Sequence, residues 1–268
     1  MNCKIPVFAI SLLCACIPSL QAQTSEDQKG QQVVDQAIAA LGGEHFLQMK
    51  TLIQAGHVYS FYHDRLSGND RAHMYTEYAA EKPGKGLGVR TREAFGKKQD
   101  YSFLYLPTEG WQITYRGARA IPEDRWKSYV RNTENNIFYI LRVRHNEPGI
   151  VYRYAGAGVL ITSEVQIVDI VDSQNRTVRV YFDRNTHLPI RETYTWFDAK
   201  LNYQNDEEVD FSKYRDAGGG VMWPFTVERS RNGYKSYQFF ADSAEAGQPI
   251  PTLKFELPPG IKMLKKIE

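Results

Sequence analysis

The sequence predicts one domain built mainly from antiparallel β-strands, an α+β fold with few helices. From Ile53 onward, apolar and polar residues alternate with a period of two in run after run. Gly, Pro, Asn and Asp separate these runs at short intervals, and helical spacing is confined to two segments. A chain of 268 residues with 42% hydrophobic residues is long enough to bury a substantial core.

Residues 1–22 are predicted to be an export signal that is cleaved from the chain. Lys4 precedes an apolar stretch from Ile5 to Leu20, which ends in the small-residue cleavage pattern Leu20-Gln21-Ala22. Prolines interrupt the stretch, and it is shorter than the ~20 apolar residues that a spanning helix needs. The mature domain is expected to be residues 23–268.

All three cysteines lie inside this signal, so cleavage after Ala22 leaves a mature chain without a thiol or a disulfide. A second interpretation stays open. The segment Leu13-Cys14-Ala15-Cys16 resembles the lipobox of bacterial lipoproteins, which would make Cys16 the acylated first residue and anchor the protein through a lipid.

The first helix is predicted over residues 31–41. Val33, Val34, Ala37, Ile38 and Leu41 recur at helical spacing, and the Gly42-Gly43 pair that follows is typical of a helix C-terminus.

Two series of strands are predicted after this helix. They lie around residues 53–61, 72–79, 88–95, 101–106 and 109–116, and then 150–154, 164–172, 176–183, 189–197, 206–215, 223–231 and 234–241. Turns are expected at Ser67-Gly68-Asn69-Asp70 and Pro83-Gly84-Lys85-Gly86. Because no change of composition marks a linker, the strands are expected to form one antiparallel meander in one domain.

A long amphipathic helix is predicted between Pro122 and Asn146, with Pro122 in its first turn. Its second half, residues 137–141, places large apolar side chains around most of the helix circumference. Such a helix needs cover on several sides. It is either a buried core helix or a helix that lies across the mouth of the sheet and lines an apolar cavity.

No motif for catalysis, a metal or a cofactor is present. The sequence lacks a nucleophile elbow, a zinc-binding His-Glu-x-x-His, a phosphate loop and a calcium loop. The net charge of +2 gives no field that would favour nucleic acid. A hydrolase with a carboxylate pair, for example near Glu207-Glu208 and Asp210, is the least favoured alternative because acidic residues on an alternating strand usually face solvent.

Four segments together resemble the periplasmic outer-membrane lipoprotein-sorting family, the LolA/LolB-like proteins. The helix from Val33 to Leu41, followed by Gly42-Gly43 and the first strand, looks like the N-terminus of that family. Residues 181–190, Tyr-Phe-Asp-Arg-Asn-Thr-His-Leu-Pro-Ile, look like a hairpin of that family in which a strand ends in Asp and re-enters through Leu-Pro. Residues 211–224 contain a similar hairpin that passes through Gly218-Gly219-Gly220 to Trp223-Pro224, and residues 255–260 are similar to the family's C-terminal end.

The resemblance implies a strongly curved, incomplete barrel of roughly ten or eleven strands with helices in its concave face. It also implies a periplasmic, non-enzymatic carrier that needs no cofactor or metal and holds the acyl chains of a lipoprotein or lipid. A monomer is expected. The alternative is an envelope-stress or assembly module that binds a protein partner through the curved sheet.

Periodicity selects the residues expected to line the apolar cavity: Trp111, Ile113, Tyr115, Trp126, Val130, Ile137, Ile140 and Leu141. Arg116, Arg119 and Arg125, near the start of the second helix, could meet a lipid headgroup or form solvated surface.

Overall fold

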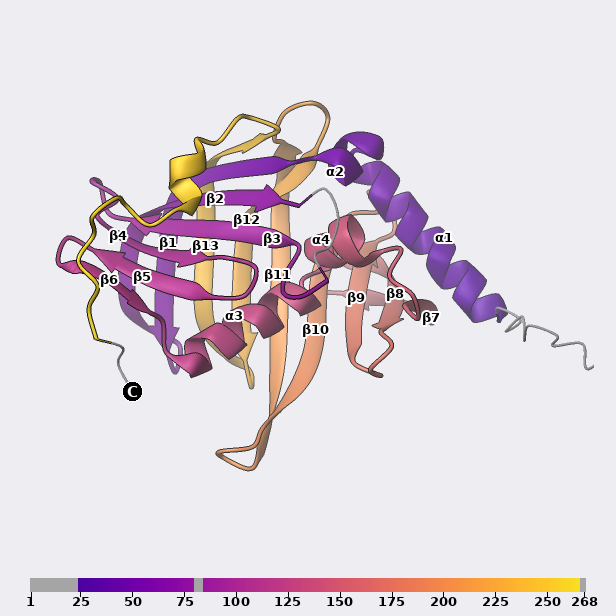
Figure 1. Ribbon diagram of the computed structural model, residues 1–268. Helices are drawn as coiled ribbons and strands as arrows, with labels where there is room; N and C mark the ends of the chain where they lie inside the picture. Colours follow the sequence, from indigo (N-terminus) through magenta and orange to yellow (C-terminus); the bar gives the residue numbers. More distant parts are fainter. Residues whose placement is uncertain (1–23, 80–83, 266–268) are drawn as a thin grey trace, which may run out of the picture.

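The computed structural model describes residues 24–79 and 84–265, so the export signal of residues 1–22 and the Cys16 alternative lie outside the described residues. The described chain forms one antiparallel sheet of 13 strands in the order β6-β5-β4-β3-β2-β1-β13-β12-β11-β10-β9-β8-β7. The sheet is not closed, and its strands curve around α3 and α4 (Figure 1). This confirms the predicted, mainly antiparallel half-barrel.

The strands are β1 (Thr51–Tyr62), β2 (Arg65–Tyr78), β3 (Val89–Phe95), β4 (Tyr101–Tyr105), β5 (Gly110–Thr114), β6 (Gly117–Ala120), β7 (Val151–Leu160), β8 (Ser163–Val171), β9 (Thr177–Asp183), β10 (Pro189–Asp198), β11 (Tyr203–Asp216), β12 (Met222–Arg231) and β13 (Tyr234–Ala246). The helical elements are α1 (Ser25–Ala40), α2 (Glu44–Gln48), α3 (Glu123–Asn135), α4 (Ile137–Tyr139), the π-helical η1 (Ile140–Arg144) and the 3-10 turn η2 (Thr252–Phe255).

The number of strands exceeds the ten or eleven implied by the resemblance. β6 was not predicted because its four residues, Gly-Ala-Arg-Ala, contain no alternation of large apolar side chains. β7 is longer than the predicted 150–154, because residues 155–158 are all Ala or Gly and carry no pattern, although this part of the strand still pairs with β8.

The predicted turn at residues 67–70 is wrong, because these residues belong to β2. The turn lies at His63 and Asp64, whose φ angles of 46° and 62° are those of a two-residue hairpin loop. Ser60 pairs with Gly68 and Phe61 pairs with Leu66, so a bulge at Ser67 absorbs the extra residue.

α1 begins six residues before the predicted helix, at Ser25, because Thr24 forms a capping box with Asp27. The Thr24 side chain accepts from the Asp27 amide (3.1 Å), and the Asp27 carboxylate accepts from the Thr24 amide (3.3 Å). The helix buries Val33, Val34 and Ala37 against β7 and β8. α1 therefore covers the sheet beside its β7 edge.

Gly30 is where α1 approaches the backbone of β7 most closely. A Cβ atom at this position would lie 2.2 Å from the carbonyl oxygen of Tyr152. Gly30→Ala is therefore expected to lower the free energy of unfolding by about 1 to 3 kcal/mol, since overpacking outweighs the gain of ~1 kcal/mol in helix propensity. Urea denaturation would measure the change. Gln31→Ala on the same helix is the control, and equal or higher stability of Gly30→Ala would contradict the close packing.

The predicted continuous helix from Pro122 to Asn146 is interrupted, which corrects that prediction. Asn136 has an extended backbone (φ −69°, ψ 127°), and its side chain accepts from the amides of Phe138 and Tyr139. It therefore ends α3 and caps a new helical segment, α4, which continues into η1. Pro122 directly precedes α3.

The segment from residue 121 to residue 150 connects the two edges of the sheet. It leaves β6 at one edge and enters β7 at the other, so α3, α4 and η1 cross the inner face (Figure 1). The largest buried cluster packs α1, α2, α4 and η1 against strands that include β7 to β12. η2 packs through Phe255 on the outer face of β3 to β5.

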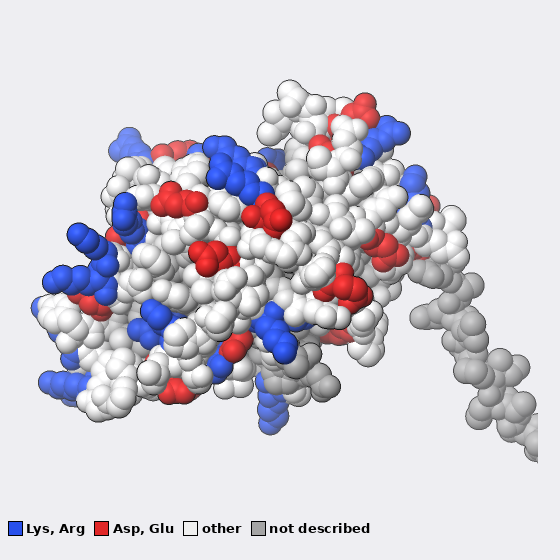
Figure 2. Space-filling view, turned by 90° about the horizontal axis from the view of Figure 1, so that it is seen from above, with Lys and Arg blue, Asp and Glu red and all other residues white. Residues whose placement is uncertain are grey.

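The C-terminal segment covers the β6 edge. Ala118 donates to the Lys262 carbonyl (2.9 Å) and accepts from the Leu264 amide (2.7 Å). Acidic and basic side chains are interspersed on the face seen from above (Figure 2). No helix within the described ranges is both long and apolar enough to cross a membrane.

Candidate binding cavity

A cavity of about 680 Å³ lies between α3 and the inner face of the sheet. Its volume is within the range of small-molecule binding sites. The sheet contributes Met74, Thr76, Tyr78, Val89, Thr91, Glu93, Phe95, Tyr105, Arg229 and Tyr237, and the helical segment contributes Asp124, Arg125, Ser128, Tyr129, Asn132, Thr133, Asn136 and Tyr139.

Local periodicity explains how these residues come together. On β2 and β3 every second residue faces the cavity, as expected for one face of a strand. On α3, Arg125, Ser128, Tyr129 and Asn132 recur every three or four residues and so form one stripe of the helix. The cavity therefore lies between the inner face of the sheet and a partly polar stripe of α3.

Tyrosines form the central wall of the cavity and attach the helical segment to β3. The rings of Tyr105 and Tyr129 stack at a centroid distance of 3.7 Å, and the Tyr129 hydroxyl donates to Thr91 Oγ1 (3.0 Å). The hydroxyl of Tyr139 accepts from the Gly88 amide (2.9 Å). Burial raises the pKa of Tyr129, and raises that of Tyr78 to about 12, so both phenols keep their protons at neutral pH.

One end of the cavity is charged. The Arg125 guanidinium lies over the Phe103 ring, 3.6 Å from its centroid, and its Nε donates to the Tyr105 hydroxyl (3.3 Å). Burial raises the pKa of Glu93, while the nearby guanidinium groups of Arg125 and Arg229 lower it. This end thus combines one carboxyl with two guanidinium groups.

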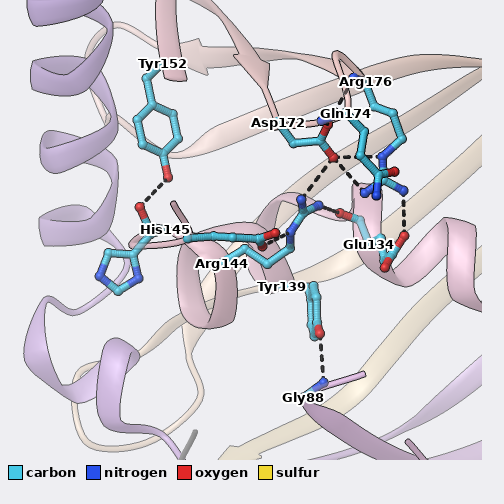
Figure 3. A network of polar contacts seen from close by, with 10 residues as sticks. Gly88, Glu134, Tyr139, Arg144, His145, Tyr152, Asp172, Gln174 and Arg176 are labelled. Carbon is cyan, nitrogen blue, oxygen red and sulfur yellow. Dashed lines mark hydrogen bonds and ion pairs between the residues drawn. The ribbon is translucent and has the colours of Figure 1, made fainter. Parts of the chain in front are cut away.

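An ion-pair network holds the far end of the helical segment in place (Figure 3). Arg144, at the end of η1, donates to Glu147 (2.7 Å), to Asp172 (3.1 Å) and to the backbone carbonyl of Glu134 (2.9 Å). Arg176 joins Asp172 to the Glu134 side chain (2.7 Å to each). Burial opposes ionisation of Asp172, but hydrogen bonds from Arg176 and Arg144 lower its pKa to about 2. The network thereby connects α3 and η1 to the β8–β9 turn.

A buried carboxyl lies under the junction of α3 and α4. Glu192 of β10 is fully buried, and its Oε2 accepts from the Ile137 amide (2.6 Å). Burial raises its pKa to about 8, although the Ile137 amide and the Arg229 guanidinium lower it. Its other oxygen has no hydrogen-bond partner within the part of the chain that the structure describes.

The structure separates the eight residues predicted to line an apolar cavity. Trp111 and Ile113 belong to the cluster on the outer face of the sheet, which contains Leu104 and Phe255. Trp111 pairs with Leu104 in the β4–β5 ladder, so both side chains lie on the same face. The next residue of β4, Tyr105, lines the cavity, so Leu104 faces away from it. Tyr115 is 78% exposed, in the β5–β6 turn.

The other five lie on the helical segment. Trp126 stacks on Tyr129 and packs beside Phe103 and Tyr105, and Val130 packs against the main core. Ile137, Ile140 and Leu141 are buried in that core. Among the described residues, the cavity lining includes none of the eight. Their contact with an acyl chain stays a prediction, which labelling with a photoreactive fatty acid would check.

Sequence reasoning missed Glu93 and Arg229, because charged residues on an alternating strand normally indicate the solvent face. The one available signal was the polar stripe of α3, from Arg125 through Ser128 to Asn132, on a helix expected to cover the sheet. Of the three arginines considered for a headgroup, only Arg125 lines the cavity in the described chain. Arg119 donates to Gln112 (2.6 Å), and exposed Arg116 donates to the Tyr115 hydroxyl (2.8 Å).

The acidic pair of β11 has partners in the sheet. Buried Glu207 accepts from Arg231 (2.6 Å) and from the Trp196 indole (3.1 Å), and Glu208 pairs with Arg191 (2.8 Å). Within residues 24–79 and 84–265, no group of three or more His, Cys, Asp or Glu side chains could hold a metal ion.

The comparison with solved structures shows that other proteins share the fold of this chain. The chain is similar to a DUF1329 family protein from Desulfovibrio piger (13% identity, TM-score 0.59, covering 87% of this chain and 98% of the other). It is also similar to a domain from Vibrio parahaemolyticus assigned as an outer membrane lipoprotein-sorting protein (11% identity, TM-score 0.56, covering 85% and 97%).

A LolA superfamily protein from Nitrosomonas europaea matches with 7% identity and a TM-score of 0.49, covering 85% and 97%. No family model and no curated protein sequence matches the chain. The predicted LolA-like resemblance is thus confirmed at the level of the fold.

Proposed function

We propose that the protein is a periplasmic, non-enzymatic carrier or binding protein that holds the acyl chain of a lipid or an acylated lipoprotein. The observation that carries this proposal is the cavity of about 680 Å³ between α3 and the inner face of the sheet. A shared fold with a domain assigned as a lipoprotein-sorting protein supports it.

The physical basis of binding is burial of the acyl chain. Each methylene transferred from water contributes about 0.8 kcal/mol, and the aromatic wall around Tyr105 and Tyr129 offers a surface for such a chain. Transport of this kind breaks no covalent bond, so the proposed function uses no cofactor and no metal.

Filling the cavity tests the proposal. Ser128 lines the cavity, and the preceding residue Lys127 has a 63% exposed side chain. Ser128→Trp is expected to weaken binding of a fluorescent fatty acid by about tenfold or more, because the indole takes up space that the chain needs. Lys127→Trp, which adds the same ring on the solvent side of the same helix, is expected to bind like the wild type.

Native mass spectrometry of protein purified without detergent should show an acyl species on the wild type and on Lys127→Trp, and less on Ser128→Trp. Thermal unfolding of the three proteins controls for folding. A wild-type protein that is empty and also ignores added fatty acid would contradict the proposal and favour the protein-binding alternative.

A further inference from the structure

The charged end of the cavity is assembled from three parts of the chain. Glu93 comes from β3, Arg125 from α3 and Arg229 from β12. Arg125 lies over Phe103, and Phe103 pairs with Glu93 in the β3–β4 ladder, so Arg125 and Glu93 are at the same level of the sheet. Arg229 pairs with Tyr237, whose pKa burial raises, while Glu93 raises it further and Arg229 lowers it. The Tyr237 phenol is therefore close to both Glu93 and Arg229.

These three charges do not neutralise one another by direct contact. Among the ion pairs of the described residues, none within 4.0 Å involves Glu93, Arg125 or Arg229. Arg229 donates to the Tyr194 hydroxyl at 3.5 Å, a long hydrogen bond. Both guanidinium groups thus keep donors for an anion that enters between them.

The neighbouring carboxyl groups leave this end with a net positive charge. Asp124, which also lines the cavity, already pairs with Lys200 (2.7 Å). Glu192, which is also near Arg229, has a pKa of about 8 and is mostly protonated at pH 7. Burial raises the pKa of the Glu93 carboxyl, so this carboxyl cancels at most one of the two guanidinium charges of Arg125 and Arg229. A net positive charge in a partly buried site favours an anionic head group such as a carboxylate.

The lining residues at the opposite end of the cavity, within the described chain, are uncharged. At the uncharged end, Tyr78 of β2 pairs with Val89 of β3. At the charged end, Met74 pairs with Glu93, which lies four residues after Val89 on β3. Four residues of strand correspond to about 13 Å. Tyr139 closes the end near Val89 through its hydrogen bond with the Gly88 amide. The cavity therefore changes along β3 from a charged end to an uncharged end, where Tyr78, Val89 and Tyr139 lie together with Thr133 and Asn136 of the helical segment.

We propose that this cavity binds a single-chain carboxylate amphiphile of the fatty-acid type, with its carboxylate between Arg125 and Arg229 and its chain directed toward Tyr78 and Val89. This inference rests on the proposed function and narrows its ligand class. The ester-linked glyceride of an acylated protein carries no anion to pair with Arg229. A free fatty acid can therefore form an ion pair at this end of the cavity that a lipoprotein cannot form.

The test compares two ligands with the same chain and different heads, dodecanoate and dodecan-1-ol, by calorimetric titration of the delipidated protein at pH 7. Arg229→Gln is expected to weaken dodecanoate binding by about tenfold to a hundredfold, the range expected for losing a charge-assisted hydrogen bond, and to leave dodecanol binding within about twofold. Arg229→Lys should restore much of the dodecanoate affinity. Arg184→Gln, which removes an exposed arginine paired with Glu164, is the matched control.

The results separate this inference from the proposed function. If Arg229→Gln weakens both ligands equally, or neither, the carboxylate site is overturned. If both ligands also bind the wild type equally and Ser128→Trp blocks them, the acyl-binding function stands without that site. If the wild type binds neither ligand, both proposals fail. Circular dichroism and thermal unfolding establish that each variant is folded.

Discussion

Replacing Arg144 with methionine is expected to lower the free energy of unfolding by about 3 to 5 kcal/mol. The Arg144 side chain is 4% exposed and holds together two carboxylates and the last turn of α3. Without the guanidinium, buried Asp172 loses a partner and the Glu134 carbonyl loses a donor. Urea denaturation followed by tryptophan fluorescence would measure the loss.

The control is Arg184→Met, which removes an exposed ion pair of similar length (2.9 Å to Glu164). Because exposed pairs contribute about 0 to 1 kcal/mol, this variant should unfold almost like the wild type. Equal losses in the two variants would show that burial of Arg144 does not matter. We also expect weaker fatty-acid binding in Arg144→Met, because the ion-pair network positions the C-terminal end of α3, the helix that lines the cavity.

The pH dependence of stability is expected to change strongly on replacement of Glu192 with glutamine. Burial raises the pKa of the Glu192 carboxyl from 4.5 to about 8 in the folded protein. The folded state therefore holds a proton that the unfolded state releases above pH 4.5. This contribution is fully present below pH 4.5, declines as the pH rises, and is lost above about pH 8, a difference on the order of 5 kcal/mol.

Glu192→Gln keeps an oxygen that can accept from the Ile137 amide and removes the titration. The difference between the urea midpoints at pH 5 and pH 8 should be smaller in Glu192→Gln than in the wild type. The substitution should raise the midpoint more at pH 8 than at pH 5. Glu164→Gln, at an exposed position, should keep the wild-type pH dependence. A Glu192→Gln variant that loses stability in parallel with the wild type would contradict the buried, protonated carboxyl.

Most of the fold could be predicted from the period-two pattern because a sheet with a buried face imposes that pattern on its strands. The errors occurred where short-range backbone chemistry decides the structure. His63 and Asp64 adopt positive φ, so they form the first hairpin turn in place of the Gly-containing segment 67–70. Asn136 lies in a segment of helical periodicity, and its side-chain cap ends one helix and begins another.

The candidate site was harder to predict than the fold because the inner face of this half-barrel is partly polar. Glu93 and Arg229 point inward at positions where alternation alone cannot tell a cavity from solvent. Conversely, Trp111 and Ile113 are apolar on alternate residues, yet they face η2 on the outer side of the sheet. Which face is the inner one depends on how the sheet curves and where η2 returns, and neither is encoded in a local pattern.

The order of the strands also has a consequence for folding kinetics. Every neighbouring pair in the sheet is consecutive in sequence except β1 and β13, which join Leu52 to Ala246. Strands β1 to β6 and β7 to β13 can therefore each form as a series of local hairpins, which close quickly. The β1–β13 pairing must bring together segments from near the two ends of the chain and bears the largest loop-closure entropy. Formation of the β1–β13 pairing is the expected slow step of folding. A substitution that destabilises this pairing should slow folding more than a substitution at either edge strand that lowers the free energy of unfolding by the same amount.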